Sequence, residues 1–168
     1  MDWAWSGGRL TYATTLESEQ IPSHALRMDR TETVFARIIR GESPCHRVYE
    51  DDFVLAFLDA HPLSFGHTLV IPKEPAVTLD ELSDDSAAAL GRALPRLCRA
   101  VQKVSGCQSY NILQNNGASA HQSVFHVHVH IIPKPSEQEG LRVGWPASPL
   151  DVSRAEELAD RLRAALVS

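Results

Sequence analysis

The sequence has 168 residues, of which 43% are hydrophobic and 22% are charged. This balance excludes an intrinsically disordered chain and fits one globular domain with a single core. The net charge of −5 argues against a surface built for long nucleic acids, because binding to such polyanions depends on Lys and Arg that neutralise phosphates. A small nucleotide needs only a local pocket, so it stays possible as a ligand.

The cysteines and the apolar runs indicate the compartment. Cys45, Cys98 and Cys107 are odd in number and form no Cys-x-x-Cys pair, so we expect no disulfide framework. No apolar run approaches the roughly 18–20 residues that a membrane span needs. The first thirty residues lack the apolar stretch of a signal peptide, and we interpret them as a flexible or loosely docked extension. We therefore expect a cytoplasmic protein.

The first half of the chain predicts one short helix and three strands. The helix begins near Thr31 or Thr33 and ends at Gly41. Two β-rich runs, 46–50 and 53–59, flank Asp51-Asp52 and predict a hairpin. A third strand covers 67–71.

The second half predicts two helices and two strands. The main helix begins at Ser83 and ends at Gly106. Its expected buried stripe is Leu90, Leu94, Leu97, Val101 and Val104. Strands are expected at 109–116 and 124–132, joined by the polar loop 117–123. The last helix has the form of a capping box at Ser153-x-x-Glu156. Two hairpins without strict alternation of strands and helices favour an α+β fold, an antiparallel sheet with helices on one side.

The most informative segment is Phe125-His126-Val127-His128-Val129-His130, in which a histidine stands at every second position. Successive side chains on a strand point to opposite faces, so the three imidazoles would share one face and the valines the other. At a rise of about 3.3 Å per residue, neighbouring rings would start roughly 6.6 Å apart. The pattern predicts a row of titratable rings backed by an apolar face.

Three interpretations of this row stay open. Buried structural histidines are common, but three at this spacing would each need its own hydrogen-bond partner. A zinc site can use His-x-His, yet no Asp-His pair follows the row and the first carboxylate after His130 is Glu137. The third interpretation is a neutral imidazole that displaces a leaving group from phosphorus and forms a covalent intermediate.

Nucleophilic catalysis needs a ring of fixed tautomer, a proton source for the leaving atom, donors for the phosphoryl oxygens and a nucleoside pocket. The middle ring, His128, is flanked by two others that could orient it. The loop 117–123 leads into the row and offers backbone N–H groups together with Gln122 and Ser123. Asn115 lies at the end of the preceding strand, close to the same loop.

The row His-φ-His-φ-His-φ-φ, which runs from His126 to Ile132, resembles the signature of the histidine triad superfamily of nucleotide hydrolases and transferases. Similarity covers roughly 31–146 and includes the opening helix at 34–44 and the stretch 66–73. Within the superfamily the chain is most similar to the Hint-like branch, the purine nucleoside phosphoramidases. The resemblance divides the chain into an N-terminal extension at 1–30, a HIT domain at 31–146 and a C-terminal extension with a helix at 147–168.

The resemblance implies a HIT-like five-stranded antiparallel sheet, a homodimer, and hydrolysis of AMP–amine bonds with AMP as product and no cofactor or metal. His128 would become transiently nucleotidylated. His130 and His126 would contact phosphate and fix the tautomer, with His67 near the site. Asp59 would bind both ribose hydroxyls. The residues implied around the base, the phosphate and the leaving group are Val34, Phe35, Ile38, Phe57, Asn115, Gln122 and Ser123.

The sequence also departs from the family pattern. Many members carry Cys-x-x-Cys in the opening helix and bind zinc there, whereas this chain has Thr33 and Ala36, so we expect no such site. His121 stands at a loop position often held by glycine. Two other functions stay open, a dinucleoside polyphosphate hydrolase and a non-enzymic AMP-binding adaptor. The leaving group and the preference for adenine or guanine are not determined by the sequence.

Overall fold

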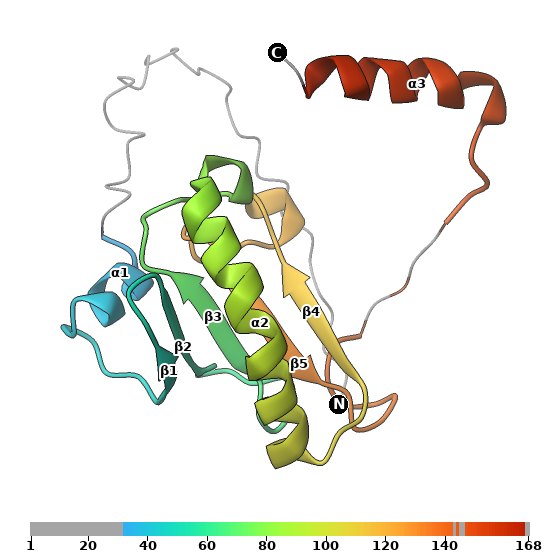
Figure 1. Ribbon diagram of the computed structural model, residues 1–168. Helices are drawn as coiled ribbons and strands as arrows, with labels where there is room; N and C mark the ends of the chain where they lie inside the picture. Colours follow the sequence, from blue (N-terminus) through green and yellow to red (C-terminus); the bar gives the residue numbers. More distant parts are fainter. Residues whose placement is uncertain (1–31, 143, 145–146, 167–168) are drawn as a thin grey trace, which may run out of the picture.

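The computed structural model describes residues 32–142, 144 and 147–166 (Figure 1), so the predicted extension at 1–30 lies outside the described residues. The regular elements, in chain order, are α1 Val34–Ile39, β1 Arg47–Glu50, β2 Val54–Leu58, β3 Thr68–Pro72, η1 Leu79–Glu81, α2 Asp84–Ser105, β4 Tyr110–Gln114, η2 Ala118–Ala120, β5 Val129–Pro133 and α3 Val152–Ala165. Among these helices, none is long and apolar enough to cross a membrane.

The five strands form one sheet in the order β1-β2-β3-β5-β4, and every neighbouring pair is antiparallel. The predicted five-stranded antiparallel α+β fold is confirmed. One register line crosses the whole sheet, because Arg47 pairs with Phe57, Phe57 with Leu69, Leu69 with His130, and His130 with Leu113. This line fixes which side chains stand beside one another on the face that carries the histidines.

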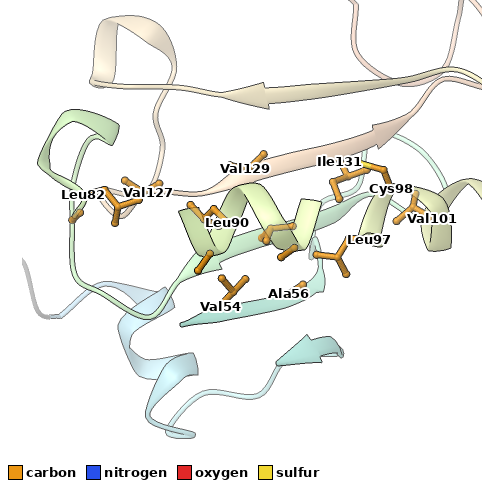
Figure 2. Close-up of a cluster of buried hydrophobic side chains, with 14 residues drawn as sticks. Val54, Ala56, Leu82, Leu90, Leu97, Cys98, Val101, Val127, Val129 and Ile131 are labelled. Atoms are coloured by element: carbon orange, nitrogen blue, oxygen red, sulfur yellow. The ribbon is translucent and has the colours of Figure 1, made fainter. Parts of the chain in front are cut away.

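The two faces of the sheet are covered by different helices. Val54 and Ala56 of β2 pack with α2 in the cluster that Figure 2 shows, whereas Leu55 and Phe57 pack with α1 in a second cluster. The expectation that the helices lie on one side of the sheet is therefore wrong. Residues 54–57 are all apolar and all buried, and a strand without polar alternation needs cover on both faces.

The main helix α2 has the predicted ends. The Ser83 hydroxyl accepts a hydrogen bond from the Ser86 N–H, and Gly106 adopts a left-handed φ of 72°. Within the expected stripe, three members are buried and Leu94 is half-buried, but Val104 is 71% exposed. The prediction for Val104 is wrong because periodicity defines the side of a helix and not how far along it the sheet continues.

The C-terminal helix α3 begins one residue before the predicted cap. Asp151 caps it instead of Ser153, because the Asp151 carboxylate accepts from both the N–H and the hydroxyl of Ser153. No residue of α3 is buried, and Figure 1 shows the helix apart from the sheet. The described core therefore consists of the sheet with α1 and α2, and α3 adds nothing to it.

The pair Leu97 and Val104 tests the burial along α2. Leu97→Ala should lower the free energy of unfolding by about 2–5 kcal/mol, because Leu97 is only 4% exposed and its removal leaves a cavity. The matched change Val104→Ala should stay within about 0.5 kcal/mol. Urea denaturation of the three proteins measures both values, and equal losses for the two variants would contradict the described packing.

Candidate active site

The histidine row lies only partly on a strand. β5 begins at Val129, five residues later than predicted, and residues 124–128 are irregular. The His126 N–H donates to the Val124 carbonyl at 2.9 Å, and the Val127 N–H donates to the carbonyl of Ala76 at 2.8 Å. The neighbouring strand β3 ends at Pro72, so this stretch bonds to the chain beyond β3 instead of to a strand ladder.

The predicted alternation of faces nevertheless holds across the irregular stretch. The rings of His126 and His128 lie 6.1 and 5.2 Å from the ring of Phe35 in α1, and the rings of His128 and His130 lie 5.0 Å apart. The alternate residues Val127, Val129 and Ile131 belong to the cluster under α2. The row therefore separates the site from the main core.

His128 is held in one tautomer by a backbone group. Its Nδ1 lies 2.7 Å from the carbonyl oxygen of His126, which can only accept a hydrogen bond, so Nδ1 carries the proton. Nε2 of the neutral ring then keeps its lone pair. His128 is 3% exposed and lines a cavity, so this lone pair is a candidate nucleophile that is largely shielded from bulk water.

His126 orients His128 through its backbone carbonyl, whereas its ring makes a different contact. Its Nε2–H donates to the carbonyl of Pro72 at 2.8 Å, its side chain is 1% exposed, and it does not line the cavity. The ring thus ties the irregular stretch to the end of β3. The expected contact of His126 with phosphate has no counterpart in this geometry, whereas the expected fixing of the tautomer is performed by its carbonyl.

His130 and His67 form a second chain of hydrogen bonds. The Leu63 N–H donates to Nδ1 of His67 at 3.1 Å, so the His67 proton sits on Nε2. This Nε2 lies 2.9 Å from Nδ1 of His130, which must accept and therefore leaves the His130 proton on Nε2. The result is an N–H on His130 beside the lone pair on His128.

Asp59, His67 and His130 also offer three possible metal ligands. Nε2 of His67 lies 2.9 Å from Nδ1 of His130 and 3.4 Å from Oδ2 of Asp59. A metal at this position would need the lone pair of His67 on Nε2 and an acceptor facing Nδ1, but the Leu63 N–H donates to Nδ1. The backbone therefore favours a hydrogen-bond network over a metal centre.

Burial keeps these imidazoles neutral. It lowers the pKa of His67, His126 and His128, and it lowers the pKa of His130 to about 4, with further repulsion from His128 and His67. The carboxylate of Asp59 acts in the opposite sense on His67, His128 and His130. Near pH 7 the site therefore combines one lone pair and one N–H without a net positive charge on the rings.

The cavity in front of His128 has a volume of about 490 Å³, within the range of small-molecule sites. It brings together eight of the predicted site residues: Val34, Phe35, Ile38, Phe57, Asp59, Ser123, His128 and His130. Asp59 lies just beyond β2, where its Oδ1 accepts from the His61 N–H at 2.8 Å. The apolar members come from α1 and β2 and form one wall, which is the expected setting for a base.

Two predicted phosphate contacts are not part of the cavity wall. The Gln122 side chain is buried, where its Oε1 accepts from the Gly117 N–H at 2.7 Å and its Nε2 donates to the Val77 carbonyl at 2.6 Å. Asn115 Nδ2 lies 3.4 Å from the carbonyl of His121. Both amides brace the loop 117–123, and Ser123 is the residue of that loop that reaches the cavity.

Sequence reasoning missed part of the wall, namely Pro44, Cys45, His46, Leu58, Ala60, His61, Leu69 and Val124. The register of the first hairpin could have indicated the segment 44–46, because it precedes the residue that pairs with Phe57. His121 has an unusual backbone conformation. Its φ is 66°, and within the described part of the chain no other non-glycine residue has a positive φ. Glycine adopts a positive φ without the steric cost that a side chain carries, so the backbone at this position would favour glycine.

The fold and the site together define an α+β protein in which two neutral histidines, His128 and His130, line a cavity of small-molecule size. A HIT domain family model matches residues 40–137, and the chain therefore belongs to the HIT domain family. It is 49% identical over 129 residues to an adenosine 5′-monophosphoramidase from Schizosaccharomyces pombe, covering 77% of this chain and 94% of that relative. An adenosine 5′-monophosphoramidase from Saccharomyces cerevisiae is 41% identical over 133 residues, covering 79% and 82%.

Solved structures agree with this assignment. A histidine triad nucleotide-binding protein from Candida albicans superimposes with a TM-score of 0.74 at 36% identity, covering 80% of this chain and 97% of that chain. A protein from Leishmania major described as hypothetical gives a TM-score of 0.77 at 46% identity, covering 82% and 97%. The shared fold therefore extends over nearly the full length of each of the two solved structures and over about four-fifths of this chain.

The neutral histidines predict that the protein loses stability in mild acid. Because their folded pKa values lie below those of the unfolded chain, the unfolded state binds more protons as the pH falls below about 6.5. Each such histidine should lower the free energy of unfolding by about 1.4 kcal/mol per pH unit until its folded pKa is reached. For His130 this window extends down to about pH 4.

Urea unfolding at pH 7, 6 and 5 measures this loss of stability. The variant His130→Asn should show a shallower decline than the natural protein over the same interval, because it removes one of the neutral rings. A free energy of unfolding that stays constant from pH 7 to pH 5 would show that the four rings are not held neutral.

Proposed function

We propose that this protein hydrolyses the P–N bond of adenosine 5′-phosphoramidates and releases AMP and an amine. The observation that carries the proposal is the free Nε2 lone pair of His128, buried and directed by the His126 carbonyl into a cavity of nucleotide size. The relatives named adenosine 5′-monophosphoramidases support the same substrate class.

In the first step, Nε2 of His128 attacks phosphorus and the P–N bond to the amine breaks. The leaving nitrogen takes a proton from water and departs as an amine. The ring becomes positively charged when it is nucleotidylated, and the His126 carbonyl that accepts from Nδ1–H stabilises that charge. A second water molecule then attacks phosphorus from the solvent side, and the proton it releases neutralises the hydroxide left by the first water. The P–Nε2 bond breaks, AMP leaves, and the neutral ring is restored.

Charge that develops on the phosphoryl oxygens needs hydrogen-bond donors. His130 provides Nε2–H because His67 occupies its Nδ1, and Ser123 provides a hydroxyl from the end of the polar loop. We assign His67 as a positioning residue, since it acts on the phosphate through His130. Lys and Arg are missing from the described cavity wall, so neutral donors carry this task.

The nucleoside occupies the rest of the cavity. Asp59 accepts hydrogen bonds from the ribose hydroxyls; this assignment is supported by its place in the cavity wall, where its Oδ2 lies 3.8 Å from Nδ1 of His130. The base lies among Val34, Phe35, Ile38 and Phe57, where Phe35 and Phe57 stand edge-to-face at 5.7 Å.

Replacement of His128 tests the function. His128→Gly should lower kcat on an adenosine phosphoramidate by at least about a thousandfold while AMP still binds, because only the nucleophile is removed. Steady-state kinetics and calorimetric titration with AMP measure the two properties separately. Near-natural turnover of the variant would refute the covalent mechanism.

The substrate panel for the natural protein separates the other functions. Turnover of a diadenosine polyphosphate well above that of the phosphoramidate would identify a dinucleoside polyphosphate hydrolase. Tight AMP binding without turnover of either substrate would identify a nucleotide-binding adaptor. Loss of activity with a chelator, restored by zinc, would identify a metalloenzyme. The cysteines are free in the described part of the chain, which supports a reducing compartment, and we propose a cytoplasmic location.

We also propose that two copies pair through the edge strand β4. The other edge, β1, carries charged residues, with Glu50 paired to Arg47 and Lys73 at 2.7 and 2.8 Å. Residues 110–114 have no charged side chain, and Tyr110 and Ile112 are 38% and 47% exposed. An uncharged, partly apolar edge is a template for pairing with another strand, whereas a charged edge resists it.

Two matched variants test the dimer. Ile112→Lys on β4 should shift the protein from a dimer to a monomer, because a lysine there is desolvated on pairing. Val48→Lys on β1, at a similarly exposed position, should leave the dimer intact. Sedimentation equilibrium measures the mass of each protein. A natural protein that sediments as a monomer, or a dimer unaffected by Ile112→Lys, would exclude this interface.

A further inference from the structure

The cavity extends across the sheet from the histidine row to the segment 44–46. Its wall includes His130 on β5, Leu69 on β3 and Phe57 on β2, which are neighbours on one register line, and then Cys45 and His46 just before β1. Adjacent strands lie about 4.8 Å apart, so three strand spacings place the two ends about 14 Å from each other. The cavity is therefore elongated, with chemically different ends.

The proposed function determines which way a nucleotide lies in this cavity, and the present inference rests on it. Phosphorus is at the His128 end, and the ribose follows at Asp59. The base must then point toward β1, with the six-membered ring of a purine farthest from the ribose. The buried ring of His128, 3% exposed and with a free Nε2, fixes the end of the cavity at which the reacting group of the ligand lies.

The segment 44–46 is held against the sheet and presents polar groups at this end. The His46 carbonyl accepts from the Leu58 N–H at 3.0 Å, which fixes the segment beside β2. Cys45 is half-buried and packs against the cluster that contains Phe35 and Phe57. Its thiol has no hydrogen-bond partner within the part of the chain that the structure describes.

We infer that Cys45 and His46 contact the six-membered ring of the purine and form the specificity-determining end of the site. The thiol lies against the ring and can donate weakly to its edge, while the imidazole can either donate to or accept from the 6-substituent and N1. Recognition of the base edge is thus separate in space and in chemistry from the reaction at phosphorus.

Thiol protection tests this arrangement, because the chain has a matched control. Cys107 is also a free, half-buried cysteine, but it does not line the cavity. AMP at a saturating concentration should slow the alkylation of Cys45 by iodoacetamide at least about tenfold and leave Cys107 unchanged. Ribose 5-phosphate, which has no base, should leave Cys45 reactive at the concentration at which it inhibits turnover. Peptide mass spectrometry measures the rate at each cysteine.

A second measurement uses a bulky side chain at the same position. Cys45→Tyr should raise KM for an adenosine phosphoramidate about tenfold with little change in kcat, because it blocks the base and leaves the reacting atoms in place. Cys107→Tyr should change neither constant. If the natural protein turns over the phosphoramidate, but AMP does not protect Cys45 and Cys45→Tyr keeps the natural KM, the inference is wrong. If the natural protein has no turnover, the proposed function itself fails.

Discussion

The site depends on one hydrogen bond, from Nδ1–H of His128 to the backbone carbonyl of His126 at 2.7 Å. A carbonyl oxygen cannot donate, so this contact excludes the other neutral tautomer and leaves Nε2 as a lone pair. Both residues of this contact lie in the segment 124–128, which is not part of the strand ladder. The backbone of this irregular segment before β5 therefore fixes the tautomer of His128.

A second backbone group determines that the neighbouring ring, His130, presents an N–H where His128 presents a lone pair. The Leu63 N–H determines the tautomer of His67, and His67 then determines that of His130. Rings only 5.0 Å apart therefore present a lone pair and an N–H side by side. Burial keeps both neutral by lowering their pKa values, so the lone pair of His128 is not lost to a proton at physiological pH. His128 and His130 therefore supply an acceptor and a donor whose tautomers are set by backbone groups.

The two faces of the sheet carry different features: one packs in the main hydrophobic core, and the other lines the cavity. α2 and the valines between the histidines form the larger cluster on one face. On the other face the short helix α1 supplies Phe35, which contacts His126, His128 and Phe57 and so joins the smaller cluster to the site. Alternation of side chains along the segment 126–131 thus gives one face to the core and the other to the site.

The sequence by itself determined the α+β class, the ends of α2 and the sharing of one face by the three histidines, because these follow from local periodicity and capping residues. Eight residues of the cavity wall followed from the histidine motif and from the family resemblance that it carries. Only the tertiary structure decided that α1 covers the opposite face, that the His126 carbonyl orients His128, that Gln122 braces its loop, and that segment 44–46 closes the far end of the cavity. The physical reason is that these features are contacts between residues distant in the chain or choices among equivalent hydrogen-bond partners. A sequence pattern specifies which side a residue faces, but not which atom it will meet there.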